Sequence, residues 1–327
     1  MHSSGHLSKQ ESIGRTASWS VTHPVSPADE AAMAALRAMV APIKGQLQGT
    51  AARGPFDAIM SRVIPPDGVT FEADTIGGVS GWWCRPENAR PDEVVLHLHG
   101  GWFNWGSALA FRNLVGHIAA RTGVAAFIPD YRLAPEHPFP AGLEDVQACY
   151  RGLVERGFQK IAISGDSAGG CLALVLLSLT TSKRKSGGKV PVGAVVLSPV
   201  TDLTLSGASW ETRAGADPYF VRSQGVDLVR SYLVDHDPAD PLASPLFGGL
   251  AGLPPIRVHV GDDEMLLDDS LRYAERAVAA GVDARVDVWK GMPHGFLSGI
   301  GSLEASSESL GQIGAFLTDR FAAASTK

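Results

Sequence analysis

Short apolar runs, rich in valine and isoleucine, recur along most of the chain and alternate with segments of helical periodicity. We predict strands at residues 69–76, 79–85, 93–99, 124–129, 160–165, 193–198, 256–260 and 284–289. The later runs are almost continuously apolar, which is typical of parallel strands covered on both faces. Gly77-Gly78 separates the first two runs and indicates a hairpin, so we expect the sheet to begin antiparallel.

Helical patterns fill the gaps between these runs. We predict helices at residues 108–122, 141–156, 168–181, 268–280 and 306–322. In the last of them, Leu310, Ile313 and Leu317 fall on one apolar stripe. Alternation of strands and helices over most of the chain predicts an α/β fold with a mostly parallel eight-stranded sheet flanked by helices.

Two segments lie outside this alternation, and we expect them to form a helical cap over the sheet. Residues 1–67 contain a helix signal that starts with Ser26 as its N-cap. Residues 201–252 are rich in Pro, Gly and Asp and contain a short helical pattern near 224–234. We predict that neither segment extends the sheet, and that residues 68–327 form the main domain with 201–252 inserted in it.

Composition narrows the class of protein. The chain is 45% hydrophobic and 19% charged with a formal net charge of −6, so neither nucleic acid nor an anionic membrane is expected as a partner. No apolar run approaches the ~20 residues that cross a bilayer, and the N-terminus lacks a secretory pattern. Cys84, Cys149 and Cys171 are widely spaced, which predicts neither disulfides nor a zinc site. We expect a cytoplasmic protein without metal or cofactor, and the sequence leaves a homodimer open.

The sequence Gly-Asp-Ser-Ala-Gly-Gly at residues 165–170 directly follows a predicted strand and opens an apolar helix. A G-x-S-x-G pattern in this context is typical of a nucleophile elbow, a sharp turn that needs glycines around a strained serine. We predict that Ser167 is a nucleophile held at the carboxyl end of the sheet, where open α/β sheets bind ligands. The alternative is a glycine-rich turn without chemistry.

Residues 96–102, Leu-His-Leu-His-Gly-Gly-Trp, end an earlier predicted strand. Glycines there let backbone N–H groups approach a tetrahedral intermediate, and the residue after the nucleophile supplies another donor. The predicted oxyanion-hole donors are the N–H groups of Gly100, Gly101, Trp102 and Ala168. His97 and His99 alternate along the same strand; because no further ligand follows at a suitable spacing, we expect them to orient the loop by hydrogen bonds.

His294 is predicted to be the general base, because it follows the last predicted strand and completes the order serine, acid, histidine. His236 in the cap insertion is a weaker alternative. The acid is expected in the loop after the seventh predicted strand, which contains Asp262, Asp263, Glu264, Asp268 and Asp269. Asp268 and Asp269 are expected to begin the next helix, where acidic residues suit the helix dipole.

Five motifs stand in a fixed order over roughly residues 70–320. They are HGG at 99–101, YRLAPEHPFPA at 131–141, GDSAGG at 165–170, SPVTDLT at 198–204 and PHGF at 293–296. In order and spacing they resemble the bacterial hormone-sensitive-lipase-like esterase family of α/β-hydrolases. The resemblance implies a serine carboxylesterase for esters with short acyl chains, with an N-terminal cap and no cofactor. Aligning the family's Asp-Pro-Leu-Arg-Asp-Glu with the sequence from Glu264 to Asp269 implies Glu264 as the acid, with Asp262 and Asp263 as alternatives.

The chain departs from this family at Trp102, where a third glycine is usual. The backbone N–H survives the change, so the oxyanion hole can still form. The indole must fill space beside the hole, which argues against bulky substrates. Further candidates for the substrate pocket are Trp105, Asp166, Trp210, Tyr219 and Phe220. Packing in the core or cap is the alternative for each aromatic side chain.

Two other functions fit the same motifs. A lactonase or an amidase would use the same triad. A non-catalytic small-molecule binder is the alternative from another class, because plant hormone receptors resemble this family. Such receptors lack a member of the triad, whereas Ser167, an acid and His294 are all present here. The sequence therefore favours an enzyme whose partner is a small-molecule ester.

Overall fold

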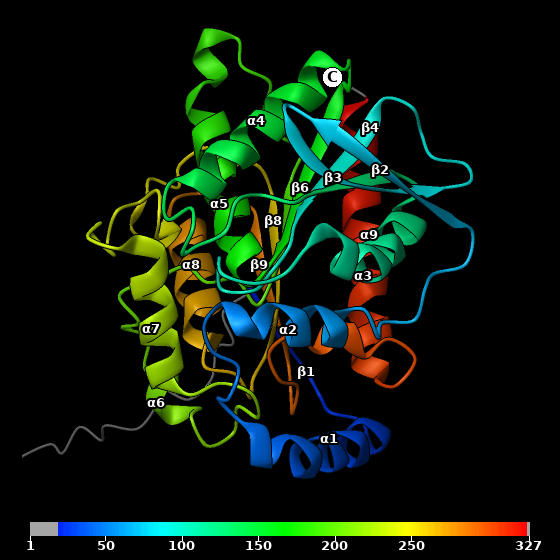
Figure 1. Ribbon diagram of the computed structural model, residues 1–327. Helices are drawn as coiled ribbons and strands as arrows, with labels where there is room; N and C mark the ends of the chain where they lie inside the picture. The colour runs from blue at the N-terminus through cyan, green and yellow to red at the C-terminus, as the bar shows by residue number, and fades with distance from the viewer. Residues whose placement is uncertain (1–18, 326–327) are drawn as a thin grey trace, which may run out of the picture.

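A nine-stranded sheet forms the centre of the computed structural model, which describes residues 19–325 (Figure 1). The strands are β1 (Ser20–His23), β2 (Val69–Ile76), β3 (Val79–Pro86), β4 (Glu93–Leu98), β5 (Ala125–Pro129), β6 (Lys160–Asp166), β7 (Ala194–Leu197), β8 (Ile256–Gly261) and β9 (Ala284–Trp289). They lie in the order β1-β9-β8-β7-β6-β4-β5-β3-β2. The β2–β3 and β3–β5 pairs are antiparallel and all other pairs are parallel, as the Gly77-Gly78 hairpin predicted.

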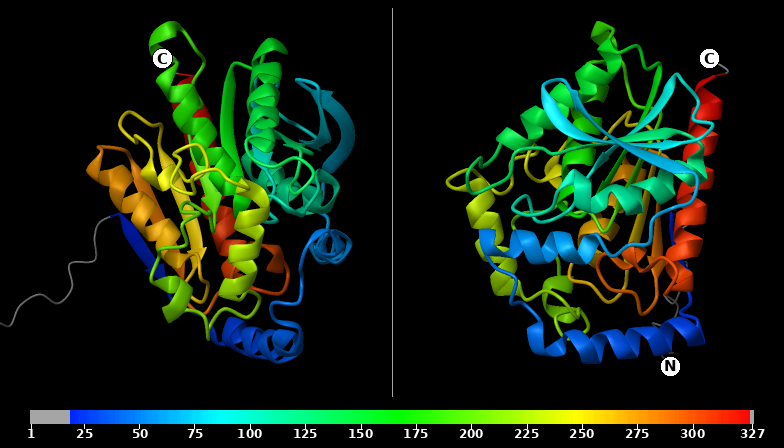
Figure 2. Two further views of the ribbon diagram at one scale, coloured as in Figure 1. Left: turned by 60° about the vertical axis from the view of Figure 1, so that its left-hand side comes forward. Right: turned by 45° about the vertical axis from the view of Figure 1, so that its right-hand side comes forward.

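Helices cover both faces of this sheet (Figure 2). They are α1 (Pro27–Val40), α2 (Arg53–Met60), α3 (Ala108–Thr122), α4 (Ala141–Glu155), α5 (Ala168–Ser182), α6 (Ser209–Thr212), α7 (Arg222–Leu233), α8 (Leu267–Ala279) and α9 (Glu304–Ala324). One face carries α3 and α9, and the other carries α4, α5 and α8. Among the helices of residues 19–325, we find none with the length and apolar character to cross a lipid bilayer.

The central strand β4 shows why the sheet must be covered twice. All six of its residues are buried, as expected for a parallel strand between two helical layers. Val94 and Leu96 belong to the core that includes α4, α5 and α8. Val95, between them, belongs to the core that includes α3 and α9. Successive side chains alternate between the two faces, so an uninterrupted apolar run serves both cores.

All eight predicted strands are present as β2 to β9, and each predicted helix lies within three residues of an observed one. The sheet has nine strands, so the prediction of eight is wrong. The prediction that residues 1–67 do not extend the sheet is wrong as well. Ser20–His23 form β1, which pairs in parallel with β9 at the edge of the sheet. Two of these four residues are exposed, so the segment has no apolar run by which the sequence would reveal a strand.

The side chain of His23 attaches β1 to its neighbour. Its ring stacks on Trp289 with centroids 4.0 Å apart and planes 12° apart. Its Nε2 lies 2.8 Å from a carboxylate oxygen of Asp287, which also accepts hydrogen bonds from Arg285. The strand is therefore held by side-chain contacts as well as by the backbone ladder.

The two segments predicted to form a cap contact each other, and their helices lie in the lower half of Figure 1. Ser26 is the N-cap of α1, as predicted, and accepts a hydrogen bond from the backbone of Asp29. Lys44, shortly after α1 in the same segment, donates 2.7 Å to the carbonyl oxygen of Ala214 and also donates to that of Asp217. The N-terminal segment thus supports the loop that enters α7.

Replacing His23 by alanine is expected to lower the free energy of unfolding by about 1–2 kcal/mol. The change removes an aromatic stack and a hydrogen bond to a buried carboxylate, while Arg285 remains paired with Asp287. Urea denaturation followed by circular dichroism measures the effect. His137→Ala, at an exposed loop position, is the control and should change stability by less than about 0.5 kcal/mol. Equal midpoints for the two variants would contradict a stabilising role of His23.

Candidate active site

Three loops of the predicted site follow strands at the carboxyl edge of the sheet. Ser167 follows β6, Glu264 lies in the loop after β8, and His294 lies in the loop after β9. In the sheet, β7 alone separates β6 from β8, and β8 pairs with β9. Parallel strands end at the same edge, so residues far apart in the sequence are brought to one region.

Ser167 sits in the sharp turn between β6 and α5. Its φ of 53° and ψ of −116° are unfavourable for a residue other than glycine, and 2% of its surface is exposed. A Cβ atom on Gly169 would lie 2.0 Å from the carbonyl oxygen of Leu98. A Cβ atom on Gly165 would lie 2.3 Å from the carbonyl oxygen of Gly169. The glycines therefore permit the close packing that keeps Ser167 strained, as in a nucleophile elbow.

The glycine-rich turn after β4 lies directly beside Ser167. A Cβ atom on Gly100 would be 3.2 Å from the Cβ of Ser167. The four predicted oxyanion-hole residues are Gly100, Gly101, Trp102 and Ala168, and all are buried. Among residues 19–325, no backbone acceptor is found for the N–H groups of Gly100, Gly101 and Trp102, and the N–H of Ala168, the first residue of α5, has no partner within its helix. Buried N–H groups normally find acceptors, so this set can receive an anionic oxygen from a ligand.

Trp102 occupies a backbone conformation that glycine adopts more readily than other residues. Its φ is 54°, and that of Phe103 is 60°, both in the left-handed region. Asn104 supports the turn, because its amide donates 2.6 Å to the carbonyl oxygen of Trp102 and 3.3 Å to that of Leu228. Its amide oxygen accepts from the hydroxyl of Ser231. Asn104 was not predicted as a residue of this site.

His97 and His99 are both buried, but only His99 bonds to the turn, as expected, whereas His97 bonds to Ser164 in the adjacent strand β6. His97 Nδ1 lies 2.7 Å from Ser164 Oγ, and His99 Nδ1 lies 2.9 Å from the carbonyl oxygen of Gly100. The ring of His99 also stacks on Tyr131, whose hydroxyl donates to the carbonyl oxygen of His99. A search of the described residues finds no group of three metal-binding side chains.

Glu264 is the carboxylate that faces His294. Its Oε1 lies 3.5 Å from His294 Nδ1, an ion-pair contact somewhat longer than a good hydrogen bond. Its Oε2 accepts from Ser198 Oγ at 2.8 Å and from the N–H of Gly261 at 3.3 Å. The side chain of Glu264 is fully buried, so the hydrogen bonds to Oε2 offset part of the cost of burying its charge, while Oε1 has only the longer contact with His294.

The other carboxylates of this loop point elsewhere. Asp262 accepts from the N–H of Gly291 and pairs with Lys290, and Asp263 pairs with Arg37 of α1. Asp268 and Asp269 lie in the first turn of α8, as predicted. Asp268 accepts from the N–H of Ser209, and Asp269 from the N–H groups of Thr201 and Asp202. His236, the alternative base, is exposed and packs against Phe139.

Three carboxylates act on the charge of His294. Burial alone lowers the pKa of His294, but Glu264, Asp166 and Asp217 together outweigh burial and raise the pKa above its ordinary value. Burial also raises the pKa of Asp166 to about 6, and the nearby charge of His294 opposes that rise. The surroundings of His294 thus favour its protonated form more than water does, an environment that would suit a general base of a serine hydrolase.

Aromatic side chains form a continuous wall next to His294. The ring of Phe220 packs edge-on against the imidazole, with ring centroids 5.3 Å apart, and against Trp102, with centroids 5.8 Å apart. Trp102 also packs against Trp210 at 5.9 Å, and Tyr219 packs against Phe220 at 6.4 Å. We call Trp102, Trp210, Tyr219 and Phe220 the aromatic wall. All four were predicted only as candidates for the substrate pocket, and the structure places them in contact with one another.

The remaining two pocket candidates are in different places. The Asp166 carboxylate lies against Gly100, next to Ser167. Trp105 is buried away from the aromatic wall, with its indole N–H donating 2.7 Å to the carbonyl oxygen of Gly49 and its ring packed on Phe56. These contacts are those of a core residue that joins the N-terminal segment to the main domain.

Asp217 is a buried residue of the site that sequence reasoning missed. One carboxylate oxygen accepts from the N–H groups of Tyr219 and Phe220 at 2.9 and 3.0 Å. The other accepts from the N–H of Met265 at 3.1 Å. Asp217 therefore ties the aromatic wall to the loop that carries Glu264. The Asp-Pro pair at this position, a common turn signal, could have drawn attention to it.

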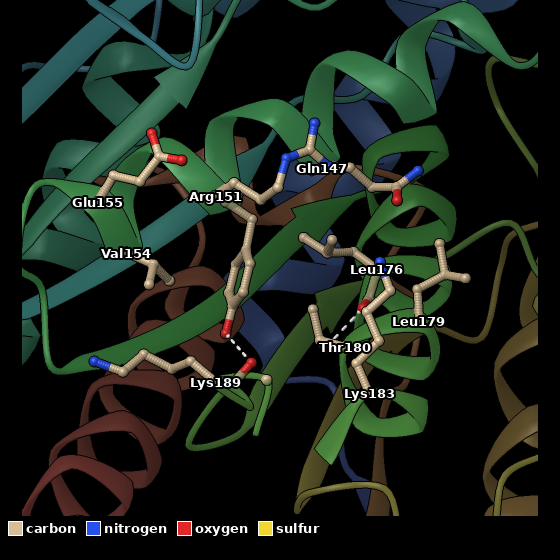
Figure 3. A pocket seen from close by; sticks show the side chains of 11 residues that line it. Gln147, Arg151, Val154, Glu155, Leu176, Leu179, Thr180, Lys183 and Lys189 are labelled. Atoms are coloured by element: carbon tan, nitrogen blue, oxygen red, sulfur yellow. Dashed lines mark hydrogen bonds between the residues drawn. The ribbon is translucent and has the colours of Figure 1, made fainter. Parts of the chain in front are cut away.

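A surface groove of about 230 Å³ lies between α4 and α5 (Figure 3). It is lined by Gln147, Tyr150, Arg151, Val154, Glu155, Leu176, Leu179, Thr180, Lys183, Gly188 and Lys189. Within it the hydroxyl of Tyr150 donates to the carbonyl oxygen of Lys189. Lys183 follows α5 and Ser167 precedes it, so the helix places them about 22 Å apart. The groove is therefore separate from the reaction site.

Comparison with known proteins identifies the family. Residues 95–298 match a family described by the alpha/beta hydrolase fold. An acetyl-hydrolase of Streptomyces hygroscopicus is 37% identical over 71% of this chain and 75% of its own. An esterase of Acinetobacter venetianus is 35% identical over 74% of this chain and 80% of its own.

Solved structures agree with the sequence comparison. The structure of an esterase/lipase from an uncultured bacterium is 34% identical, with a TM-score of 0.83 over 91% of this chain and 100% of its own. An esterase from the bacterial hormone-sensitive lipase family is 36% identical, with a TM-score of 0.82 over 90% of this chain and 98% of its own. The chain therefore belongs to the α/β-hydrolases, among the bacterial esterases of the hormone-sensitive lipase family.

Proposed function

We propose that this protein is a serine carboxylesterase with Ser167 as nucleophile, His294 as general base and Glu264 as the triad acid. The observation that carries the proposal is the strained Ser167 beside four buried backbone N–H groups, for which no backbone acceptor is found among residues 19–325. A serine hydroxyl next to such donors suits attack on a carbonyl group, because the donors stabilise the oxyanion that forms.

The reaction has two halves, formation of the acyl-enzyme and its hydrolysis, and each half needs two proton transfers. His294 accepts the proton of Ser167 as Oγ bonds to the ester carbonyl carbon, and the carbonyl oxygen becomes an oxyanion held by the N–H groups. The intermediate then expels the alcohol, whose oxygen takes the proton back from His294. Water repeats the sequence on the acyl-enzyme, which releases the acid and restores Ser167. Glu264 fixes the orientation of the imidazole and stabilises its protonated form.

Small acyl groups suit this site best. Phe220 and Trp102 of the aromatic wall stand beside His294 and the glycine-rich turn, so they limit room near the reacting carbonyl. We propose that residues 1–67 and 201–252 act together as a cap over the site. Contacts of Lys44 with the 214–217 loop support that arrangement for the described part of the first segment. The names of the acetyl-hydrolase and esterase relatives agree with a small-ester substrate.

Replacing Ser167 by alanine is expected to remove nearly all hydrolysis of p-nitrophenyl acetate. Without the nucleophile, the oxyanion donors leave a residual acceleration of ~10³–10⁴ over water. Initial rates against a buffer blank measure the loss, and thermal unfolding checks that the variant is folded. Turnover like that of the wild type would contradict the proposal. A wild-type protein that binds small esters without hydrolysing them would favour the non-catalytic alternative.

Replacing Glu264 by glutamine is expected to lower kcat by several orders of magnitude, with little effect on thermal stability. The amide keeps the shape but supports the wrong imidazole tautomer, a change that costs ~10⁴ in serine proteases. Asp262→Asn and Asp263→Asn are matched controls, because their carboxylates pair with Lys290 and Arg37 instead. Measurements of kcat/KM on one short ester compare the three variants. A crippling effect of either control, with an active Glu264→Gln, would assign the acid to an aspartate.

Replacing Trp102 by glycine is expected to extend the range of substrates. The wild type should hydrolyse esters from acetate up to hexanoate faster than dodecanoate and tertiary-alcohol esters. In the variant, the difference in rate between these two groups of esters should be smaller. Glycine also relieves the positive φ of Trp102, so the variant should fold. A panel of p-nitrophenyl esters of increasing length measures the preference. Equal wild-type rates on short and long esters would show that Trp102 does not limit the pocket.

A further inference from the structure

Ser198 contacts the triad acid, but the mechanism above gives it no role. It is the first residue after β7, the strand between those that lead to Ser167 and Glu264. Its hydroxyl donates 2.8 Å to Oε2 of Glu264, and 1% of its surface is exposed. Because the opposite carboxylate oxygen, Oε1, faces His294, the hydroxyl holds the side of the acid that does not react.

The backbone of Ser198 is strained to make this contact. Its φ is 44°, in the left-handed region that residues other than glycine rarely adopt. Its N–H donates 2.8 Å to the carbonyl oxygen of His259 in β8, so the sheet hydrogen bonding continues into the turn. Strained residues persist where the surroundings fix them, and they are common at functional sites.

We propose that Ser198 is a positioning residue that orients the carboxylate of Glu264 toward His294. The inference rests on the proposed triad. Glutamate has one more rotatable bond than the aspartate usual at this position, so its carboxylate needs a firmer anchor. Ser198 Oγ and the N–H of Gly261 both bind Oε2, which leaves Oε1 for the imidazole. The hydroxyl thereby allows glutamate to serve as the triad acid at a position where aspartate is usual.

The surroundings of the pair make this role measurable by pH. The charged groups that raise the pKa of His294 are Glu264, Asp166 and Asp217, and Glu264 contacts it directly. The Ser198 hydroxyl is neutral, so removing it leaves the number of charges unchanged. A carboxylate that turns away from the imidazole raises the pKa of His294 less. The acid limb of the pH profile of kcat/KM reports the pKa of the base in the free enzyme. Without the Ser198 hydroxyl, that limb should therefore move to lower pH.

Two variants separate the hydroxyl from the backbone strain. Ser198→Ala and Ser198→Gly both remove the hydrogen bond, but only glycine relieves the positive φ, so Ser198→Gly should be the more stable variant. Both should lower kcat about tenfold to a hundredfold, the size expected for a hydrogen bond to a charged group, with KM nearly unchanged. Both should also shift the acid limb to lower pH.

Ser206→Ala is the matched control. Its hydroxyl also donates to a buried carboxylate, that of Asp202, which is paired with Arg272 rather than with His294. The control should keep the wild-type kcat and acid limb. If Ser198→Ala does not fold, Ser198→Gly alone decides the question.

Wild-type kcat in Ser198→Gly, or an acid limb that stays in place or moves to higher pH, would overturn the positioning role. Those outcomes leave the triad intact as long as Ser167→Ala is inactive. An active Ser167→Ala would instead overturn the proposed function itself. The two failures are therefore distinguishable in one set of variants.

Discussion

The close contact between Gly169 and the end of β4 is the constraint on which the site depends. The α5 backbone approaches the carbonyl oxygens of Leu98 and His99 so closely that a Cβ on Gly169 would lie 2.0 and 2.4 Å from them. This approach turns the chain sharply at Ser167 and places it beside the turn that begins at Gly100. The proposed nucleophile and oxyanion donors are thus brought together by a close backbone contact between α5 and the end of β4.

Burying charged groups at this edge of the sheet costs free energy, and hydrogen bonds to the buried carboxylates offset part of that cost. Glu264 and Asp217 are almost fully buried, and each accepts hydrogen bonds from at least two donors. His294 lies among these carboxylates, which favour its protonated form over its neutral one. Glu264 and Asp217, which raise the pKa of His294, are therefore held in place by Ser198 and by the backbone N–H groups of Tyr219 and Phe220. Packing, electrostatics and orientation of the base are parts of one network.

The sequence predicted the central sheet and the reactive loops because local patterns carry them. β2 to β9 have apolar runs, and the turn at Ser167 has its glycines within a few residues. β1 was missed because an edge strand with exposed residues has no such pattern. Ser198 was noted only as part of a motif, and Asp217 was missed, because their partners Glu264 and Met265 lie 66 and 48 residues away in the sequence. Trp105 was a candidate for the pocket but lies in the core, because the sequence does not distinguish a buried indole in the core from one in the pocket.

Covalent labelling tests the central claim most directly. A serine-directed organophosphate should react once per chain and abolish ester hydrolysis, because the nucleophile is a single activated hydroxyl. Mass spectrometry of the digested protein should then place the phosphoryl group on Ser167, and His294→Ala should react far more slowly. A label on any other residue, or full hydrolysis by protein labelled at Ser167, would contradict this account.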